Sequence, residues 1–325
     1  MSESDPLTVE EIRAALGVLA GRVRRTPVEP LHGPEIEREF GDATRVYLKL
    51  ELFQFTGTFK ARGALLNALR LPDDAKQRGV TAISAGNHAI AVAFAARAAG
   101  THAKIVMIKS ANALRVARCE EYGAEIVFAP DAHAGFRMVE HIAREEGRTL
   151  IHPFEGRTTV LGTATLGWEL SEQVPDLEAV IVPIGGGGLC AGVASAIKLA
   201  NPNCRVFGVE PFGADSMYRS FQAGEPRGIE RVATIADSLG APYALPISFA
   251  LCRRNTEAVV RVSDDELRAA MRFLLRNAKL AVEPAGAAAT AALLRPLREE
   301  LRGKRVGLIV CGSNIDAASY AALIA

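Results

Sequence analysis

The chain has 325 residues, and its 38 lysines and arginines against 37 aspartates and glutamates leave a formal net charge of +1. This even balance argues against a nucleic-acid partner, because a general polyanion-binding surface needs an excess of positive charge. Hydrophobic residues make up 49% and charged residues 23% of the chain, which indicates a folded protein with a large core. At roughly 150 residues per domain, about two domains are expected.

Short runs rich in valine and isoleucine alternate with alanine-rich stretches of helical spacing. In chain order, strands are expected at 80–84, 103–108, 179–183, 205–209, 259–262 and 306–311. Ser263 and Glu266 have the spacing of a capping box and predict an amphipathic helix after the 259–262 strand. Parallel strands require crossover helices, so the alternation predicts an α/β fold with an open, mostly parallel sheet covered on both faces.

The cysteines are scattered along the chain and include no C-x-x-C pair: Cys119, Cys190, Cys204, Cys252 and Cys311. This spacing indicates neither a disulfide framework nor a zinc site, so a cytoplasmic location is expected. The first residues are acidic and lack the apolar core of a signal peptide. Apolar stretches such as 89–100 are interrupted well before the roughly 20 residues of a membrane helix, so no membrane partner is expected.

Four consecutive glycines, Gly185 to Gly188, follow the apolar strand at 179–183 and precede a helical stretch. Backbone amides without side chains can converge there on an anion at a helix N-terminus. The loop is not a P-loop, because no Lys-Ser/Thr pair follows, and it does not convincingly match the dinucleotide pattern G-x-G-x-x-G. The pattern therefore favours a phosphate site, and the alternative is a tight strand-to-helix turn.

Lys60 lies in the segment TGTFKARGAL, where Thr56 or Thr58 can cap the helix that begins near it. Between Phe59 and a face of small residues, its amine would be desolvated. Desolvation lowers the pKa of a lysine and makes it nucleophilic toward an aldehyde. Taken alone, the pattern fits a surface lysine better.

The segment SAGNHA, 84–89, begins at the end of a strand and opens a helix, so its free amides can hold a carboxylate. His88 taken alone is more often a structural histidine than a catalyst. Cys311 ends the last apolar strand, at the edge where open α/β sheets bind ligands. Its alternative is a small buried hydrophobic residue.

These features occur together in the order and spacing of one family. The segments that carry the likeness are KLELFQFTGTFKARGA, SAGNHA, VPIGGGGL, GVEPFGADS, AVEPAGAAA and VCGSNID. They resemble the fold-type II pyridoxal-phosphate enzymes, and more closely the serine/threonine dehydratases, a group similar to serine racemase. The resemblance covers nearly the whole chain and implies pyridoxal 5'-phosphate as the cofactor.

The resemblance also implies how the chain is organised. Two open, mostly parallel sheets would lie in a large and a small domain, with the active site in the cleft between them. The large domain would comprise 1–78 and 155–325, and the small domain 79–154. Binding of a substrate carboxylate to the small domain would draw the two together and exclude water. A homodimer is expected by family analogy.

The resemblance gives the candidate residues their roles. Lys60 would form the Schiff base with the cofactor and then remove the Cα proton. Asn87 would hydrogen-bond the ring hydroxyl, and Cys311, or Ser313 if the alignment shifts, would face the pyridine nitrogen. Further cofactor contacts are expected from Phe59, Gly185, Gly186, Gly187, Gly188 and Leu189. The substrate would be held by Ser84, Ala85, Gly86, Asn87 and His88.

A neutral partner for the pyridine nitrogen favours β-elimination over transamination. The implied activity is PLP-dependent dehydration and deamination of a small β-hydroxy amino acid, threonine or serine, to a 2-oxo acid and ammonia. One alternative is the same fold acting as a hydroxyaspartate-type dehydratase or an amino acid racemase. Another, from a different class, is a non-catalytic anion- or nucleotide-binding α/β protein.

Some positions depart from the usual pattern of the family. Ala85 stands where racemases of this fold place a serine that protonates the opposite face, so efficient racemisation is not expected. The cation-binding positions read Glu210, Ala214 and Ser216, with one carboxylate fewer than in divalent-dependent relatives. Hard divalent ions usually gather more carboxylate charge, so a monovalent cation such as potassium is expected here.

Two further departures concern the substrate. Relatives usually read GQGT where this chain has GTAT at 162–165, and ADG where it has ADS at 236–238. Both segments are expected near the substrate pocket, which leaves open a substrate other than threonine or serine. The chain ends soon after the last strand, so the regulatory domain of biosynthetic threonine dehydratases, and with it feedback by isoleucine, is not expected.

Overall fold

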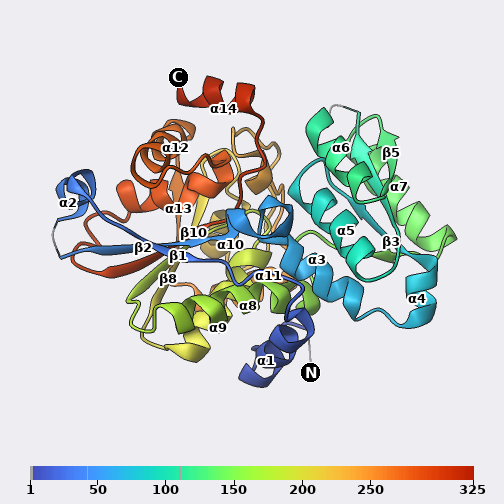
Figure 1. The fold of residues 1–325 in the computed structure, drawn as a ribbon, viewed down its shortest axis with the longest axis horizontal. Helices are drawn as coiled ribbons and strands as arrows, with labels where there is room; N and C mark the ends of the chain where they lie inside the picture. The colour runs from blue at the N-terminus through green and yellow to red at the C-terminus, as the bar shows by residue number, and fades with distance from the viewer. Residues whose placement is uncertain (1–2, 42, 110) are drawn as a thin grey trace.

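Two sheets organise the protein. The computed structural model describes residues 3–41, 43–109 and 111–325. Within these ranges the larger sheet has six strands in the order β1-β2-β10-β7-β8-β9, and the smaller has four in the order β5-β4-β3-β6. Figure 1 shows the two sheets in separate lobes, each accompanied by helices. The expected α/β class with two parallel-rich sheets is confirmed.

The larger sheet is parallel except at one edge, where β1 runs antiparallel to β2. Its strands are β1 (Val28–Leu31), β2 (Arg45–Leu50), β7 (Ala179–Pro183), β8 (Arg205–Pro211), β9 (Ala258–Val262) and β10 (Arg305–Val310). Its helices are α1 (Val9–Leu19), α2 (Pro34–Phe40), α3 (Lys60–Leu69), α8 (Arg157–Gln173), α9 (Gly188–Ala200), α10 (Ser216–Ala223), α11 (Pro246–Asn255), α12 (Asp264–Ala278), α13 (Pro284–Leu294) and α14 (Ala317–Ile324). Short 3₁₀ helices are η1 (Glu51–Phe53), η2 (Phe55–Gly57) and η3 (Asp237–Leu239).

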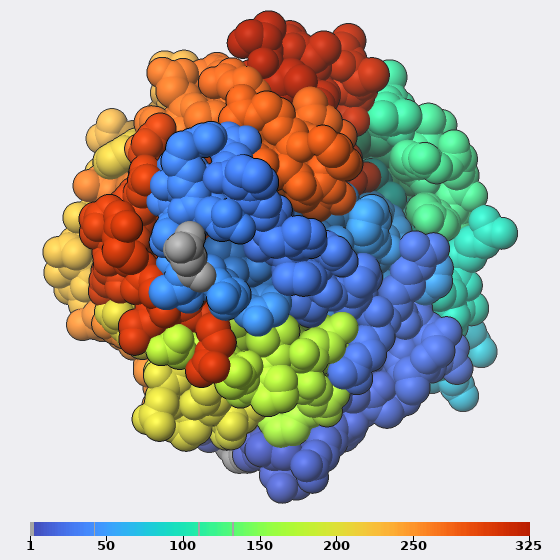
Figure 2. Space-filling view, turned by 60° about the vertical axis from the view of Figure 1, so that its left-hand side comes forward, coloured from blue at the N-terminus to red at the C-terminus, as the bar shows by residue number. Residues whose placement is uncertain are grey.

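Both ends of the chain build the larger unit. Strand β2 near the start pairs in parallel with β10 near the end, with Val46 opposite Val306. Figure 2 shows the blue N-terminal and the orange-to-red C-terminal segments side by side on one face. Within the described ranges, every helix is too short or too polar to cross a membrane.

The smaller sheet is wholly parallel. Its strands are β3 (Val80–Ile83), β4 (Ala103–Ile108), β5 (Glu125–Ala129) and β6 (Thr149–Leu150), and its helices are α4 (Asp73–Arg78), α5 (Asn87–Ala98), α6 (Ala113–Glu121) and α7 (Ala132–Glu145). All four strands fall within 79–154, but α4 also contacts this unit, because Thr101 Oγ1 donates to the Lys76 carbonyl. The domain boundaries themselves stay a prediction.

Local sequence signals account for several elements. Ser263 and Glu266 form the expected capping box at the start of α12, which buries Leu267, Met271 and Leu274 on one face. Helices α8 and α9 pack at very close range at Gly192. A Cβ added to this residue would lie only 2.5 Å from the Val160 carbonyl oxygen. Glycine at this contact lets the two backbones approach and fixes the start of α9 beside the larger sheet.

Candidate active site

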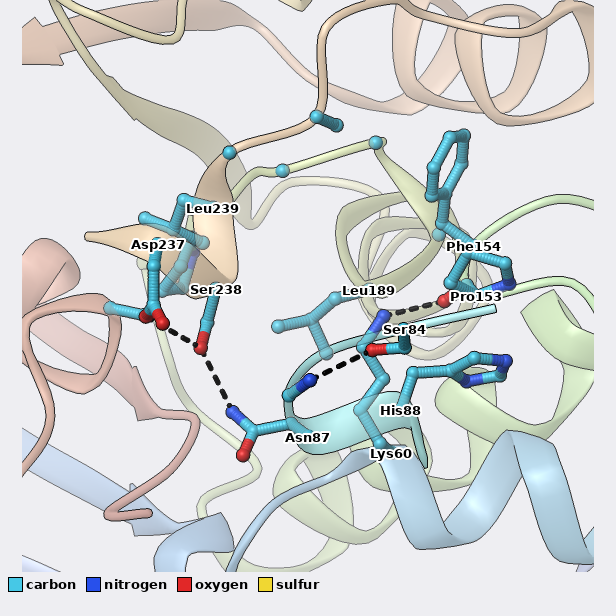
Figure 3. Close-up of a pocket in the computed structure, with 18 of the residues that line it drawn as sticks. Lys60, Ser84, Asn87, His88, Pro153, Phe154, Leu189, Asp237, Ser238 and Leu239 are labelled. Atoms are coloured by element: carbon cyan, nitrogen blue, oxygen red, sulfur yellow. Dashed lines mark hydrogen bonds between the residues drawn. The ribbon is translucent and has the colours of Figure 1, made fainter. Parts of the chain in front are cut away.

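A cavity of about 320 Å³ lies between the two sheet units. The residues predicted for the active site gather on its walls: Phe59, Lys60, Ser84, Ala85, Gly86, Asn87, His88, Gly185, Gly186, Gly187, Gly188, Leu189 and Cys311. Figure 3 shows Lys60 reaching into the space toward the loop that carries Pro153. Segments far apart in the sequence therefore supply one site.

The amine of Lys60 projects from the first turn of α3. Its Nζ donates a hydrogen bond of 2.5 Å to the Pro153 carbonyl and lies 5.1 Å from the centroid of the Phe59 ring. Burial lowers the pKa of Lys60 to about 8, and the nearby Cys311 and Glu283 oppose this shift. At neutral pH a useful fraction of the amine is uncharged and can act as a nucleophile or base.

Backbone contacts with the end of β10 hold Lys60 in place. Thr58 pairs with Gly312 in an isolated β-bridge, and the Phe59 amide donates to the Cys311 carbonyl. The Thr58 hydroxyl accepts a 3.3 Å hydrogen bond from the Lys60 amide, as a capping residue would. Thr56, the other expected cap, instead lies in the left-handed region with φ of 71°.

The glycine loop connects β7 to α9 and leaves no room for side chains. A Cβ on Gly186 would lie 2.2 Å from the Phe154 ring, and one on Gly188 would lie 2.3 Å from the Phe154 carbonyl oxygen. Gly187 has φ of +97°, and α9 begins at Gly188. The backbone amides of this loop therefore lie at the N-terminus of α9, where the helix dipole is positive, on the cavity wall. This arrangement can bind a phosphate group.

The GTAT segment supports this loop from behind. Thr163, in the middle of α8, donates a 2.7 Å hydrogen bond from Oγ1 to the Gly188 carbonyl. Residues 162–165 lie one layer behind the cavity wall, whereas Asp237 and Ser238 of the ADS segment lie on the wall itself. Of the two departures noted in the sequence, only the ADS segment thus lines this cavity.

The SAGNHA segment turns sharply between β3 and α5. Ser84 Oγ accepts a 3.1 Å hydrogen bond from the Gly86 amide, and α5 begins at Asn87. The His88 ring is buried and its Nε2 hydrogen-bonds the Ile151 carbonyl at 2.8 Å. Burial, reinforced by the charge of Lys60, lowers the pKa of His88 to about 3, so the ring is neutral and donates from Nε2. This geometry indicates that the His88 side chain is structural and not catalytic.

Asn87 uses both hydrogens of its side-chain amide. Nδ2 donates to Ser238 Oγ at 3.1 Å (Figure 3) and to Glu283 Oε1 at 2.7 Å. Oδ1 accepts from Asn314 Nδ2 at 2.7 Å. A ring hydroxyl that accepts from Asn87 must therefore displace one of these acceptors. Ser238, which stands where relatives carry glycine, supplies the longer bond.

Cys311 faces the cavity, and its thiol donates to the Ala285 carbonyl at 3.3 Å. Burial and the charge of Glu283 raise the pKa of the thiol, so it stays neutral. Ser313 lines a separate cavity and is not on this wall. Of the two candidates for the pyridine nitrogen, Cys311 alone therefore lies in the site.

Sequence patterns missed several residues on the wall. Glu283 belongs to the AVEPAGAAA segment but was given no role, and Arg115 of α6 sits in an ordinary helical pattern. Arg115 Nη1 donates to Asp237 Oδ2 at 2.6 Å. The aromatic residues Phe136, Phe154 and Tyr243 also line the cavity. Only tertiary contact brings these residues together, and among them the AVEPAGAAA segment of Glu283 was the one local signal already noted.

The expected cation positions gather at the start of α10. The carboxylate of Glu210 accepts backbone hydrogen bonds from Met217 at 3.0 Å and Tyr218 at 2.7 Å. Burial raises the pKa of Glu210 to about 8. No cluster of three or more His, Cys, Asp and Glu side chains within the described ranges is arranged to hold a metal. A potassium ion at Glu210, Ala214 and Ser216 stays a prediction.

Known proteins resemble this chain over nearly its full length. Residues 19–312 match the family described as pyridoxal-phosphate dependent enzyme. The chain is 53% identical over 330 residues to phenylserine dehydratase of Ralstonia pickettii, covering 99% of this chain and 98% of that one. It is 39% identical over 308 residues to L-threo-3-hydroxyaspartate ammonia-lyase of Pseudomonas sp, covering 94% and 95%.

A solved structure gives the same result. Maize serine racemase superposes with a TM-score of 0.92 at 35% identity, covering 97% of this chain and 96% of that one. The expectation of a catalyst is confirmed, and the non-catalytic anion-binding alternative is excluded. The chain belongs to the pyridoxal-phosphate-dependent enzymes of fold type II, in the ammonia-lyase group of that family.

Proposed function

We propose that this enzyme removes water from a β-hydroxy amino acid whose Cβ carries an aromatic group, and releases the 2-oxo acid and ammonia. The observation that carries the preference is the aromatic wall of the cavity, formed by Phe136, Phe154 and Tyr243. Threonine and serine, the substrates expected from the sequence, offer this wall no ring to contact. The 53% identity to a phenylserine dehydratase supports the same preference.

The cavity fits the cofactor that the family implies. Lys60 would hold it covalently, the Gly185 to Gly188 loop with Leu189 would hold its phosphate, and Phe59, Asn87 and Cys311 would surround its ring. Pyridoxal phosphate, when bound, supplies an aldehyde for the substrate amine and withdraws electrons from Cα. The neutral Cys311 thiol would limit that withdrawal and favour elimination.

The protein's own groups perform the remaining work. The Lys60 amine, with a pKa of about 8, would accept the Cα proton at Nζ. The N-terminus of α5 at 84–88 would bind the substrate carboxylate. The Arg115–Asp237 ion pair lies beside this turn, since a Cβ added to Gly86 would be 3.2 Å from Arg115 Nη1. Contacts between the two units would keep water from the deprotonated carbon.

The aromatic wall is built from both units. Phe136 comes from α7 beside the smaller sheet, and Phe154 and Tyr243 lie 6.3 Å apart between ring centroids with a 56° tilt. Tilted and edge-to-face aromatic contacts contribute about 0.5–1.5 kcal/mol beyond the area that they bury. A phenyl group on Cβ would gain such contacts, whereas a methyl group or hydrogen would not.

The same cavity disfavours the two enzymatic alternatives. Among the described residues on its wall, the lysine and arginine side chains are Lys60 and Arg115, and Asp237 already pairs with Arg115. A second substrate carboxylate, as in hydroxyaspartate, would lack a free cation. Racemisation would need a proton donor on the opposite face, and Ala85 has no hydroxyl there.

The test is a substrate panel with the purified holoenzyme. We expect kcat/KM for 2-oxo acid release from phenylserine to exceed that from threonine, serine and 3-hydroxyaspartate by on the order of tenfold or more. Preference for threonine or serine would overturn the aromatic preference and support the substrates expected from the sequence. Preference for hydroxyaspartate would overturn the proposal, and racemisation without oxo-acid release would overturn the reaction type.

A further inference from the structure

Glu283 is a buried carboxyl on the cavity wall. It directly precedes α13 and is 2% exposed. Its Oε1 accepts the 2.7 Å hydrogen bond from Asn87 Nδ2, but its Oε2 has no hydrogen-bond partner among the described residues. An ionised carboxylate removed from water with one oxygen unpaired is costly. The local geometry therefore favours the protonated form.

Of the surrounding charges, Asp237 favours the protonated form of Glu283 and Arg115 opposes it. The titratable groups that face Glu283 come from four elements: Asp237 of η3, Arg115 of α6, Lys60 of α3 and Cys311 after β10. None of these cations forms an ion pair with Glu283 among the described residues, because Arg115 pairs with Asp237 and the Lys60 amine donates to Pro153. Burial and then the charge of Asp237 raise the pKa of Glu283 to about 7.

We propose that Glu283 is a proton-holding residue that positions the cofactor: its neutral carboxyl fixes the Asn87 amide and keeps this wall uncharged, and its ionisation weakens cofactor binding. The Asn87 amide cannot turn over freely, because its Oδ1 accepts from Asn314 while its Nδ2 faces Glu283. When Glu283 loses its proton to solvent, an unpaired anion faces a cofactor that is itself anionic at its phosphate.

The inference concerns cofactor binding and does not depend on which amino acid reacts. The first experiment compares wild-type and Glu283→Gln apoproteins, titrated with pyridoxal phosphate from about pH 6 to about pH 8.5. Lys60 and the cofactor titrate in both proteins, so the ratio of the two dissociation constants reports the ionisation of Glu283 together with its effect on the pKa of Lys60. We expect the wild-type constant to rise relative to that of E283Q by on the order of tenfold across this interval.

A second variant moves the transition. Asp237→Asn removes the neighbouring charge and frees Arg115, and both changes lower the pKa of Glu283. In D237N the weakening of cofactor binding should therefore begin at a lower pH than in wild type. Adding Glu283→Gln to D237N should remove the part of the pH dependence that Glu283 causes. If cofactor binding weakened at the same pH in D237N as in wild type, Glu283 would not be the titrating group.

A third readout needs no cofactor. The infrared spectrum of the wild-type apoprotein should contain a protonated-carboxyl band that fades as the pH rises through about 7 and that E283Q lacks. Glu210 remains in both proteins, so its band cancels in the difference. A dissociation-constant ratio that stays flat with pH, or a wild-type band absent at pH 6, would overturn the proposal.

Discussion

Arg115 and Asp237 form a 2.6 Å ion pair that joins α6, beside the smaller sheet, to η3, beside the larger one. Both residues line the active-site cavity and also a second cavity of about 340 Å³, so the pair lies between the two spaces. Asn87 and Ser238 make a second link of 3.1 Å between the same units. The two units are thus tied together beside the cavity by polar contacts that substrate binding can reinforce.

Breaking the ion pair should loosen closure. We expect Arg115→Ala to raise KM several-fold with a smaller effect on kcat, because a partly exposed pair contributes about 1 kcal/mol at most. Arg118→Ala is the matched control, since Arg118 pairs with Glu121 on the same helix. Solution scattering with a substrate analogue should show compaction of the wild type. Equal KM values in the two variants would contradict a role in closure.

The lowered pKa of Lys60 predicts how the apoprotein takes up its cofactor. Only the neutral amine attacks an aldehyde, so the reconstitution rate should rise about fivefold between pH 7 and pH 8 and level off above a pKa of about 8. An ordinary lysine would keep gaining through pH 10. Absorbance after mixing apoprotein with pyridoxal phosphate measures the rate.

Lys60→Ala should lose both the borohydride-trapped adduct and turnover, and appreciable elimination by this variant would remove Lys60 from the mechanism.

The glycine loop should reject even one methyl group. Gly188→Ala places a Cβ 2.3 Å from a backbone oxygen of Phe154, so the loop must shift. We expect a large loss of cofactor affinity and a destabilisation of about 1–3 kcal/mol. Gly17→Ala in the exposed part of α1 meets no atom within 4 Å and should stabilise the protein by about 0.5–1 kcal/mol. Thermal unfolding and cofactor titration distinguish the two variants. A tight cofactor complex in G188A would contradict the assignment of the glycine loop as the phosphate site.

A buried ionic network anchors the helix that carries Lys60. The fully buried Arg62 guanidinium contacts Glu51 at 2.8 Å and Glu169 at 2.8 Å, and Lys49 donates to Glu169 at 2.9 Å. Burial alone would raise the pKa of Glu169, but the hydrogen bonds and charges of Arg62 and Lys49 lower it. That stabilisation is present above the unfolded pKa of Glu169 and is lost as the pH falls through the folded value.

Arg62→Met leaves buried carboxylates without their partner. We expect it to lower the free energy of unfolding by about 3–5 kcal/mol at neutral pH. Arg25→Ala removes the exposed pair with Glu172 and should cost less than about 1 kcal/mol. Denaturant unfolding compares the two variants. Similar losses in both would show that the buried network is not what secures α3.

Local signals account for what the sequence could predict. The apolar strand at 179–183, the glycines after it and the capping box of α12 are contiguous, and each has a short-range physical cause. Strand β2 was missed because RVYLKL mixes polar and apolar residues. The buried amine of Lys49 finds its acceptors outside the strand, at Thr26 and, more than 100 residues away, at Glu169 and Gln173. Glu283 and Arg115 were missed for the same reason, since their neighbours come from other elements.

The side chain of Phe136 tests the aromatic preference directly. It projects from α7, is 40% exposed and lines the cavity, so a substrate ring could cover it. We expect Phe136→Ala to lower kcat/KM for phenylserine by on the order of tenfold, because an aromatic contact and the area that it buries are lost. The value for threonine should change little, since a methyl group makes no such contact.

Phe128→Ala is the control for this variant. Phe128 lies on β5 of the same unit with 45% exposure, but it is not on the cavity wall. Its removal should leave the ratio of the phenylserine and threonine specificity constants unchanged. If F136A lowered both constants equally, Phe136 would support the structure of the site and not its selectivity. If the ratio of the phenylserine and threonine specificity constants were unchanged in F136A, the preference for an aromatic substrate would have to come from Phe154 or Tyr243. Those rings would remain the aromatic contacts available to the substrate.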